Sequence, residues 1–505
     1  MIRSIVFNYL GMIVGGLVGF LLTPLLIHGL GDYYYGMWIL VASIVDYYGV
    51  ADIGIRFTLQ RHVARWKGIG ERQALNRTFA TALSISLVVS VVILLMSASL
   101  MRWVPTVFHV AGGNRVLFGR VLFLLAISFA VALPGKVLGA YLCGLQRFDL
   151  YNMIGSGTTV LQAILILWAL HSGYGIQGCA TITLITALLS LVLCWKAVYI
   201  ADPQVSLDLR STTWAEALEL LSFGFYVFVN QVGDLFRFRL DSLVIGHWLD
   251  ISLVTHFNVA ARLVEYFRYV HSAIIGPLIS EMSALDGQAK EKRVQGLFLR
   301  STRMTALLSL FLGALICLNG RAILSFWVGN AYVSSYVVLV TLIVGRVVQT
   351  MQLPSMVLLL ARGKHKALGW WTLCEGVVNL ALSIHWAKSY GILGVALGTA
   401  VPMLLFRLIV QPWYTLWVGK ISALLYFVES IARPLAVLAV FLAFVWVGGF
   451  TPGRPSILAF LSRVFVQAAL YGAITYLIGV TGIERQELHG LFRTHVFGRQ
   501  AVPAA

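Results

Sequence analysis

The sequence predicts an all-α, polytopic membrane protein with about fourteen transmembrane helices, arranged as two six-helix lobes and two extra helices. Three observations support this fold class: an apolar composition, a series of long apolar segments and an internal repeat. Hydrophobic residues make up 59% of the 505 residues and charged residues 11%, whereas soluble domains have about 25% charged residues. The mean hydropathy is +0.86. This composition excludes an ordinary soluble protein.

The long apolar segments give the number of helices. A helix needs roughly 20 apolar residues to cross about 30 Å of hydrocarbon. Fourteen segments meet this requirement, at about 5–30, 34–57, 78–101, 116–142, 151–171, 175–195, 216–248, 252–280, 304–326, 333–361, 367–387, 391–414, 434–450 and 457–480. The loops between them are short, so we expect no inserted soluble domain.

An internal repeat relates the two halves of the chain. Residues 45–68 and 264–287 align without a gap at an offset of 264 − 45 = 219. In each copy a carboxylate, Asp46 or Glu265, precedes two aromatic residues inside an apolar segment. A period of about 220 residues is too long for a solenoid and indicates a duplicated domain.

The repeat predicts four parts of the chain. These are an N-lobe at 1–205 with helices 1–6, a C-lobe at 206–418 with helices 7–12, helices 13 and 14 at 419–482, and a tail at 483–505. Since six is an even number, both lobes should insert in the same orientation. A pseudo-two-fold axis along the membrane normal would then relate them, as in parallel-repeat transporters.

The distribution of Lys and Arg predicts the orientation. The loops on one side of the predicted membrane hold 23 of these residues and those on the other side hold four. By the positive-inside rule, both termini are expected in the cytoplasm. The net charge of 37 − 20 = +17 follows from this topology and does not indicate nucleic acid binding, because the aromatic residues lie inside apolar segments rather than among the basic ones.

The cysteines indicate neither a metal site nor a redox motif. All five lie within or beside apolar segments, without a CxxC or other metal-ligand spacing. They are Cys143, Cys179, Cys194, Cys317 and Cys374. We expect free packing residues, no metal and no cofactor.

Ionisable side chains inside the spans are the candidate functional residues. Each costs roughly 2.5–3.5 kcal/mol at the centre of a membrane helix, so they should face one another or a water-filled cavity. Helical spacing predicts structural ion pairs between Asp52 and Arg56, and between Arg237 and the two acids that flank it, Asp234 and Asp241.

A surplus of positive charge remains in the second half. It is clearest at Arg346, which has no acidic residue within its own span. We expect four arginines to line an anion-binding cavity: Arg346, Arg239, Arg262 and Arg268. The alternative is that interhelical ion pairs use these arginines to hold the lobes together.

Asp46 and Glu265 are candidates for ion coupling, because they occupy equivalent positions in the repeat. The alternative is that they only balance nearby arginines.

Several short motifs resemble those of a known family. They are LG and YGMW within 30–38, DIGI at 52–55 followed by Arg61 and Ala64, GLQRF at 144–148 and FWVGNAY at 326–332. Together with the 6+6+2 plan, they resemble the Wzx-type flippases, bacterial polysaccharide exporters of the multidrug/oligosaccharidyl-lipid/polysaccharide (MOP) superfamily. The resemblance covers about residues 4–415.

The resemblance implies two lobes around a cationic cavity with alternating access in the bacterial cytoplasmic (inner) membrane. It implies transport of an undecaprenyl-pyrophosphate-linked oligosaccharide from the cytoplasmic to the periplasmic leaflet, without enzymatic activity. Membrane lipids, a polysaccharide polymerase and chain-length proteins would be the partners. One departure is that helix 1 has no arginine after Arg3, whereas related lipid II flippases carry arginines in helices 1 and 2.

Two other functions are weighed against this one. A drug/cation antiporter of the same superfamily usually needs a carboxylate in helix 1, which this chain lacks, and its cationic substrates would be repelled by the arginines. A membrane-embedded glycosyltransferase or polysaccharide polymerase needs paired carboxylates or metal ligands on a large external loop, and the external loops here are short and nearly uncharged.

Overall fold

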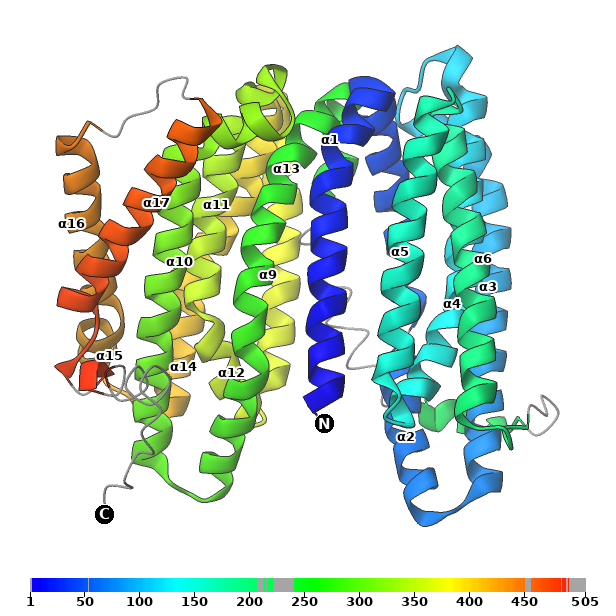
Figure 1. Ribbon diagram of the computed structural model, residues 1–505, viewed down its shortest axis with the longest axis horizontal. Helices are drawn as coiled ribbons and strands as arrows, with labels where there is room; N and C mark the ends of the chain where they lie inside the picture. Colours follow the sequence, from blue (N-terminus) through cyan, green and yellow to red (C-terminus); the bar gives the residue numbers. More distant parts are fainter. Residues whose placement is uncertain are drawn as a thin grey trace. The chain divides into compact units, whose positions relative to one another are not determined.

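The structure is a computed structural model of the chain (Figure 1). It describes residues 2–52, 54–206, 212–214, 216–220, 240–449, 456–482, 484–486 and 489, with the side chains of 2–9, 51–52, 272–274 and 365 excepted. The chain forms two compact units. Unit 1 comprises Met1–Val259 and Thr372–Gly398, and unit 2 comprises Ala260–Trp371 and Thr399–Ala505.

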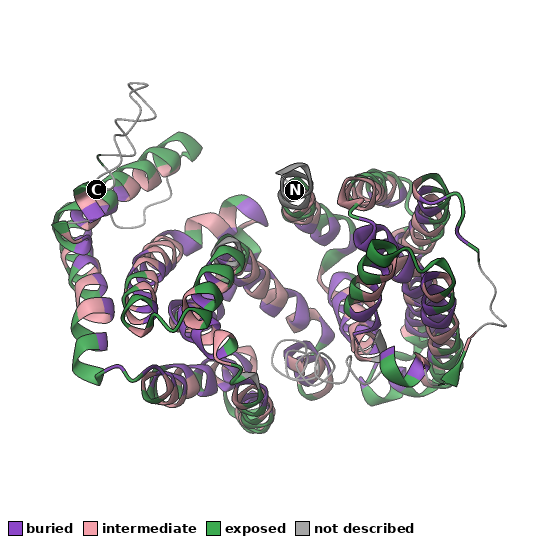
Figure 2. Cartoon of the chain, turned by 90° about the horizontal axis from the view of Figure 1, so that it is seen from below, coloured by how far each residue is buried: buried purple, intermediate pink, exposed green. Residues whose placement is uncertain are grey.

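The predicted all-α polytopic fold is confirmed. Every regular element of the described residues is helical, and ten of the helices are long and apolar enough to cross a membrane. Large apolar side chains such as Val88, Leu95 and Trp446 are exposed on the outward faces, while the buried residues lie where helices meet (Figure 2). Exposed apolar faces of this extent suit lipid rather than water as the surroundings.

Most predicted spans have a helical counterpart, although the one predicted at 434–450 begins earlier, at Ala423. Most of 216–248 lies outside the described residues. In two places, consecutive predicted spans are joined directly, without a loop, and a single glycine separates the two helical parts. α1 (Ile2–Asp46) breaks at Gly31, where φ is +75°, and α13 (His365–Leu405) breaks at Gly391, where φ is +58°. Glycine adopts positive φ without a steric cost, so each break can be sharp.

Unit 1 contains a compact bundle. Its elements after α1 are η1 (Tyr47–Asp52), α2 (Ile55–Ile69), α3 (Arg72–Val107), η2 (Gly112–Asn114), α4 (Arg115–Gly144), α5 (Phe148–His171), α6 (Gly175–Ala201), α8 (Leu240–Trp248) and the start of α9 (Ile251–Gly287). α4 packs against α2, α3 and α6, and α1 packs against α5. A Cβ at Gly144 would lie 2.7 Å from the Val63 side chain, so only glycine lets α4 and α2 approach this closely.

α2 differs from the sequence prediction, which placed most of it in a loop. Its fifteen residues bury Ile55, Leu59 and Val63 against the bundle, and carry Arg61 and Arg65 on other faces. A hydropathy criterion for membrane spans overlooks such a short, half-polar helix because its apolar residues cover only one face.

A buried carboxylate ties three helices of unit 1 together at one end. Arg72, at the start of α3, donates to both oxygens of Asp202 at 2.6 and 2.7 Å, and the Tyr141 hydroxyl donates to the same carboxylate at 2.8 Å. Burial alone raises the pKa of Asp202, but the hydrogen bonds from Arg72 and Tyr141 outweigh it and hold that pKa below its ordinary value. The carboxylate therefore stays charged and keeps α3, α4 and the end of α6 together.

Unit 2 is built from the rest of α9 and from the helices after it. These are α10 (Glu291–Trp327), η4 (Asn330–Ser335), α11 (Tyr336–Met351), α12 (Leu353–Ala361), the end of α13, η5 (Phe406–Val410), α14 (Gln411–Gly419), α15 (Ala423–Tyr426), η6 (Phe427–Ala432), α16 (Arg433–Val447), α17 (Ile457–Ile474) and η7 (Thr475–Gly479). η5, η6 and η7 are π-helical turns. The predicted span 333–361 is divided at Gln352, two residues before Pro354, which has no N–H to continue the helix.

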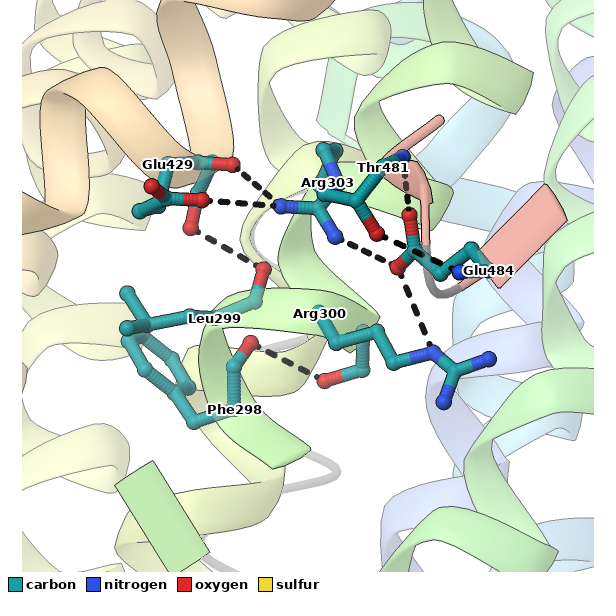
Figure 3. A network of polar contacts seen from close by, with 9 residues as sticks. Phe298, Leu299, Arg300, Arg303, Glu429, Thr481 and Glu484 are labelled. Atoms are coloured by element: carbon teal, nitrogen blue, oxygen red, sulfur yellow. Dashed lines mark hydrogen bonds and ion pairs between the residues drawn. The ribbon is translucent and has the colours of Figure 1, made fainter. Parts of the chain in front are cut away.

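A network of charges around the buried Arg303 and Glu484 fastens the last helices to α10 (Figure 3). The Arg303 guanidinium, 5% exposed, pairs with Glu484 after α17 and lies 3.3 Å from Glu429 of η6. Arg300 approaches Glu484 at 3.3 Å, and the Thr481 backbone N–H donates to the same carboxylate at 2.7 Å. Burial raises the pKa of Glu484, but the hydrogen bonds from Thr481 and Arg303 lower it to a net value below the ordinary one.

This network predicts that Arg303 stabilises unit 2 far more than Arg300. Arg303→Ala leaves two carboxylates without their shared buried cation and should cost about 3–5 kcal/mol. Arg300→Ala is the matched control, because this side chain is 47% exposed and a surface pair contributes about 0–1 kcal/mol. Thermal unfolding of the purified variants measures the difference, and equal losses would contradict it.

Candidate functional site

Arg346 lies in the interior of unit 2, as its predicted role requires. It is the eleventh of the sixteen residues of α11 and is 6% exposed. Its Nη1 donates to the side-chain oxygen of Gln349, one turn later, at 2.6 Å. A Cβ at the preceding residue, Gly345, would lie 3.3 Å from the Cα of Ala400, so the end of α13 passes close beside Arg346.

A second buried arginine, Arg407, repeats this arrangement. It lies in the π-helical turn η5, which packs against α11, and it is 8% exposed. Its Nη1 donates to the side-chain oxygen of Gln411, whose Nε2 donates to the Gln352 carbonyl at 3.0 Å. Gln352 in turn donates to the Tyr426 hydroxyl at 2.8 Å. A chain of amides therefore orients this guanidinium.

In these contacts the two guanidiniums meet neutral amides. Each amide oxygen fixes the orientation of the guanidinium that donates to it. Sequence reasoning placed Arg407 inside a span without including it in the anion-binding set. The sequence does contain a pattern that relates the two arginines, because each is followed three or four residues later by a glutamine.

α9 holds the other described members of the predicted cationic set. Arg268 pairs with Glu265 one turn earlier, with Nη2 at 2.5 Å and Nε at 3.1 Å from the same oxygen, and its guanidinium lies 5.1 Å from the centre of the Tyr269 ring. This contact fits the alternative that Glu265 balances a nearby arginine. Arg262 is half-buried and lies three residues before Glu265 on the same helix.

Other predicted residues are described in part or not at all. Asp234, Arg237 and Arg239 lie outside the described residues, so their roles stay predictions. Asp241 is buried in α8. The pairing of this carboxylate with Arg237 likewise stays a prediction.

The first repeat copy has a helix break at the predicted Asp52–Arg56 pair. Gly54, with φ +67°, interrupts the helix between the two residues, so the helical spacing behind that pair is absent. The Asp52 side chain lies outside the described residues, and the pair stays a prediction. Arg56 lies over the Phe57 ring at 5.0 Å, and Asp46 is half-buried at the end of α1.

Sequence reasoning missed Lys136, which lies within the predicted span 116–142. It is half-buried in α4, with its ammonium 4.6 Å from the centre of the Phe129 ring. The same criterion of an ionisable residue within a span would have identified it. The cysteines agree with the prediction: all five are free.

Comparison with known proteins relates the chain to polysaccharide export. Residues 34–337 match a family model described as polysaccharide biosynthesis protein. A putative O-antigen transporter of Shigella flexneri is 21% identical over 425 residues, covering 82% of this chain and 97% of the relative. A probable flippase, AglR, of Haloferax volcanii is 23% identical over 402 residues, covering 77% of this chain and 78% of the relative.

Solved structures share the fold. The lipid II flippase MurJ in an inward closed conformation superimposes with a TM-score of 0.71 at 13% identity, covering 94% of this chain and 98% of that one. An inward-facing multidrug resistance transporter of the MATE family gives a TM-score of 0.69 at 16% identity, covering 83% of this chain and all of that one.

Proposed function

This chain belongs to the polysaccharide biosynthesis family of Wzx-type flippases in the MOP superfamily, and we propose that it moves a polyprenyl-pyrophosphate-linked oligosaccharide across the membrane. The substrate would pass from the cytoplasmic to the periplasmic leaflet of the bacterial inner membrane by alternating access. Membrane lipids surround the protein, and a polysaccharide polymerase and chain-length proteins are proposed partners.

The observation that carries this proposal is the buried pair of amide-oriented guanidiniums, Arg346 and Arg407. A cation at membrane depth is costly and therefore marks a functional site. A pyrophosphate has oxygens spaced for the two parallel N–H groups of a guanidinium, which is the strongest form of this recognition. The hydrogen bond to Gln349 engages one of the five donors of Arg346 and fixes the plane of the fork.

Arg239, Arg262 and Arg268 are proposed to extend the anion site from the predicted helix 7 and from α9. The half-buried Arg262 and Arg268 lie six residues apart on α9, about 9 Å along the helix axis. A drug/cation antiporter remains the alternative of the same fold, but buried arginines disfavour cationic substrates electrostatically.

Arg346 is predicted to be needed for export as an arginine, not merely as a cation. Arg346→Lys and Arg346→Ala should each reduce export at least about tenfold, because a lost charged hydrogen bond is worth roughly 1.5–3 kcal/mol. The measurement is lipid-linked oligosaccharide accumulating on the cytoplasmic leaflet, beside protein abundance.

Arg321→Lys and Arg321→Ala are the matched controls for Arg346. Arg321 is an exposed arginine of the same unit whose guanidinium lies over the Tyr336 ring, and its variants should export normally. Full export by an abundant Arg346→Ala protein would refute the proposed site. Loss of abundance instead of activity would assign Arg346 a structural role.

Asp46 and Glu265 are proposed to take part in ion coupling. Asp46→Asn and Glu265→Gln should weaken flipping under an imposed ion gradient and leave expression normal, because the titratable charge is removed while the size of the side chain is kept. Glu265→Gln also removes the ion pair with Arg268. Glu281→Gln, an exposed position on the same helix as Glu265, is the control. Variants that both transport like the unmodified protein at every pH would place coupling elsewhere.

The proposed topology has both termini in the cytoplasm. Reporter fusions after His109, Asn330 and Arg454 should report the periplasm, and fusions after Arg72, Lys292 and Gly490 the cytoplasm, since basic loops stay inside. Reporter enzymes that are active on only one side of the membrane make this measurement. A cytoplasmic signal at Asn330 would contradict the register of the second half.

A further inference from the structure

A hydrogen-bonded relay of three side chains, His271, Ser309 and Thr350, lies in the interior of unit 2. His271 of α9, Ser309 of α10 and Thr350 of α11 are 0%, 0% and 2% exposed. The His271 Nε2 lies 3.0 Å from the Ser309 Oγ, and the Thr350 Oγ1 lies 2.9 Å from the same oxygen. Three separate helices therefore supply one continuous polar path inside an apolar bundle.

The contacts define the proton positions when His271 is neutral. Its Nδ1 lies 3.0 Å from the Phe267 carbonyl, which only accepts, so Nδ1 carries the hydrogen. Nε2 then accepts from the Ser309 hydroxyl. The Ser309 oxygen accepts from the Thr350 hydroxyl. Every polar group of these three side chains then has a hydrogen-bond partner.

The same three side chains also satisfy a protonated imidazole. With a proton on Nε2, His271 donates to Ser309, and the Ser309 hydroxyl turns to donate to Thr350. The Thr350 hydroxyl then donates to its own helix, where the carbonyls of Arg346 and Val347 lie at 3.0 and 2.9 Å. Two hydroxyl rotations thus convert one fully bonded state into the other, and neither state leaves a buried polar group unsatisfied.

We propose that His271 is a proton-binding site of this transporter and that Ser309 and Thr350 are the positioning residues that let it gain and lose the proton. The proton comes from the aqueous phase, adds to the Nε2 lone pair, and returns from the same atom to the aqueous phase. This inference rests on the proposed function and deepens it, because it names the proton as a coupling ion.

The charged groups on the surrounding helices link this site to the anion site. On α9, Arg268 lies one turn before His271 and is paired with Glu265. On α10, Arg303 lies six residues before Ser309 and is paired with Glu429 and Glu484. On α11, Arg346 lies one turn before Thr350, and its backbone carbonyl is one of the relay's acceptors.

Protonation of His271 therefore adds a positive charge to a unit that already holds buried arginines. A diphosphate bound at Arg346 offsets this charge, so anion binding and protonation should favour each other. By linkage, each must strengthen the other by the same factor.

The first test is the titration of His271 by NMR of the full chain in nanodiscs, with the histidine rings isotopically labelled. His271→Gln assigns the signal. Thr350→Val should weaken proton binding about fivefold, or roughly 0.7 pH unit, because the Ser309 hydroxyl loses its acceptor in the protonated state. Ser309→Ala should alter the titration as well, and serves if the valine variant fails to fold.

Thr302→Val is the matched control. Thr302 is equally buried on α10 and donates to the Phe298 carbonyl at 2.8 Å, but lies outside the relay. Its variant should titrate like the unmodified protein. A His271 signal that does not titrate while the fold is intact, or equal shifts in the Thr350 and Thr302 variants, would overturn the proposal.

The second test separates this proposal from the proposed function. Flipping of a fluorescent polyprenyl-pyrophosphate-linked disaccharide is measured in proteoliposomes with and without a proton gradient. The unmodified protein should respond to the gradient, and His271→Gln should flip without responding. Flipping that ignores the gradient in both overturns the coupling role. A titrating His271 in a protein that flips none of this substrate counts against the proposed function and not against the proton site.

Discussion

The cost of a charge inside hydrocarbon constrains this whole structure. A buried ion must be paired, oriented by dipoles or met by a ligand, and the described interior shows the first two solutions. Arginine–carboxylate pairs hold helices together at Asp202 in unit 1 and at Glu484 in unit 2. Glutamine amides orient Arg346 and Arg407. Both solutions keep a buried guanidinium fixed in orientation.

Each unit has a structural pair in which an arginine near the beginning of a long helix binds a carboxylate. Arg72 lies at the start of α3, and Arg303 lies in the first part of α10, where each binds a carboxylate that follows a later helix. In both cases one guanidinium joins elements distant in sequence.

The candidate functional residues lie close together within unit 2. Arg346 and the chain from His271 to Thr350 lie on adjoining turns of α11 and its neighbours, so an anion and a proton would bind to the same unit. Linkage between them needs no long-range pathway, since the backbone carbonyl of Arg346 is itself an acceptor for Thr350. A transporter can use such linkage to make substrate affinity depend on pH.

The sequence by itself determined the helical class, the span positions and the family. These follow from composition, from apolar segment length and from short motifs, all of which are local. The contact between Glu265 and Arg268 is also local, because residues three apart in one helix face the same side. It could not place the pairs between helices, such as Arg303 with Glu484, since nothing in one segment states which other segment packs beside it.

Only the tertiary structure decided which face of α2 is covered and how the buried polar groups are hydrogen-bonded. α2 escaped a hydropathy criterion because its single apolar face is defined by the bundle that covers it. The relay of His271, Ser309 and Thr350 joins residues 38 and 41 positions apart. The sequence shows an ionisable His271 inside a span, but it does not show which hydroxyl groups on other helices contact it. Hydrogen bonds depend on the distance and direction between atoms, and helix packing alone brings these atoms within reach.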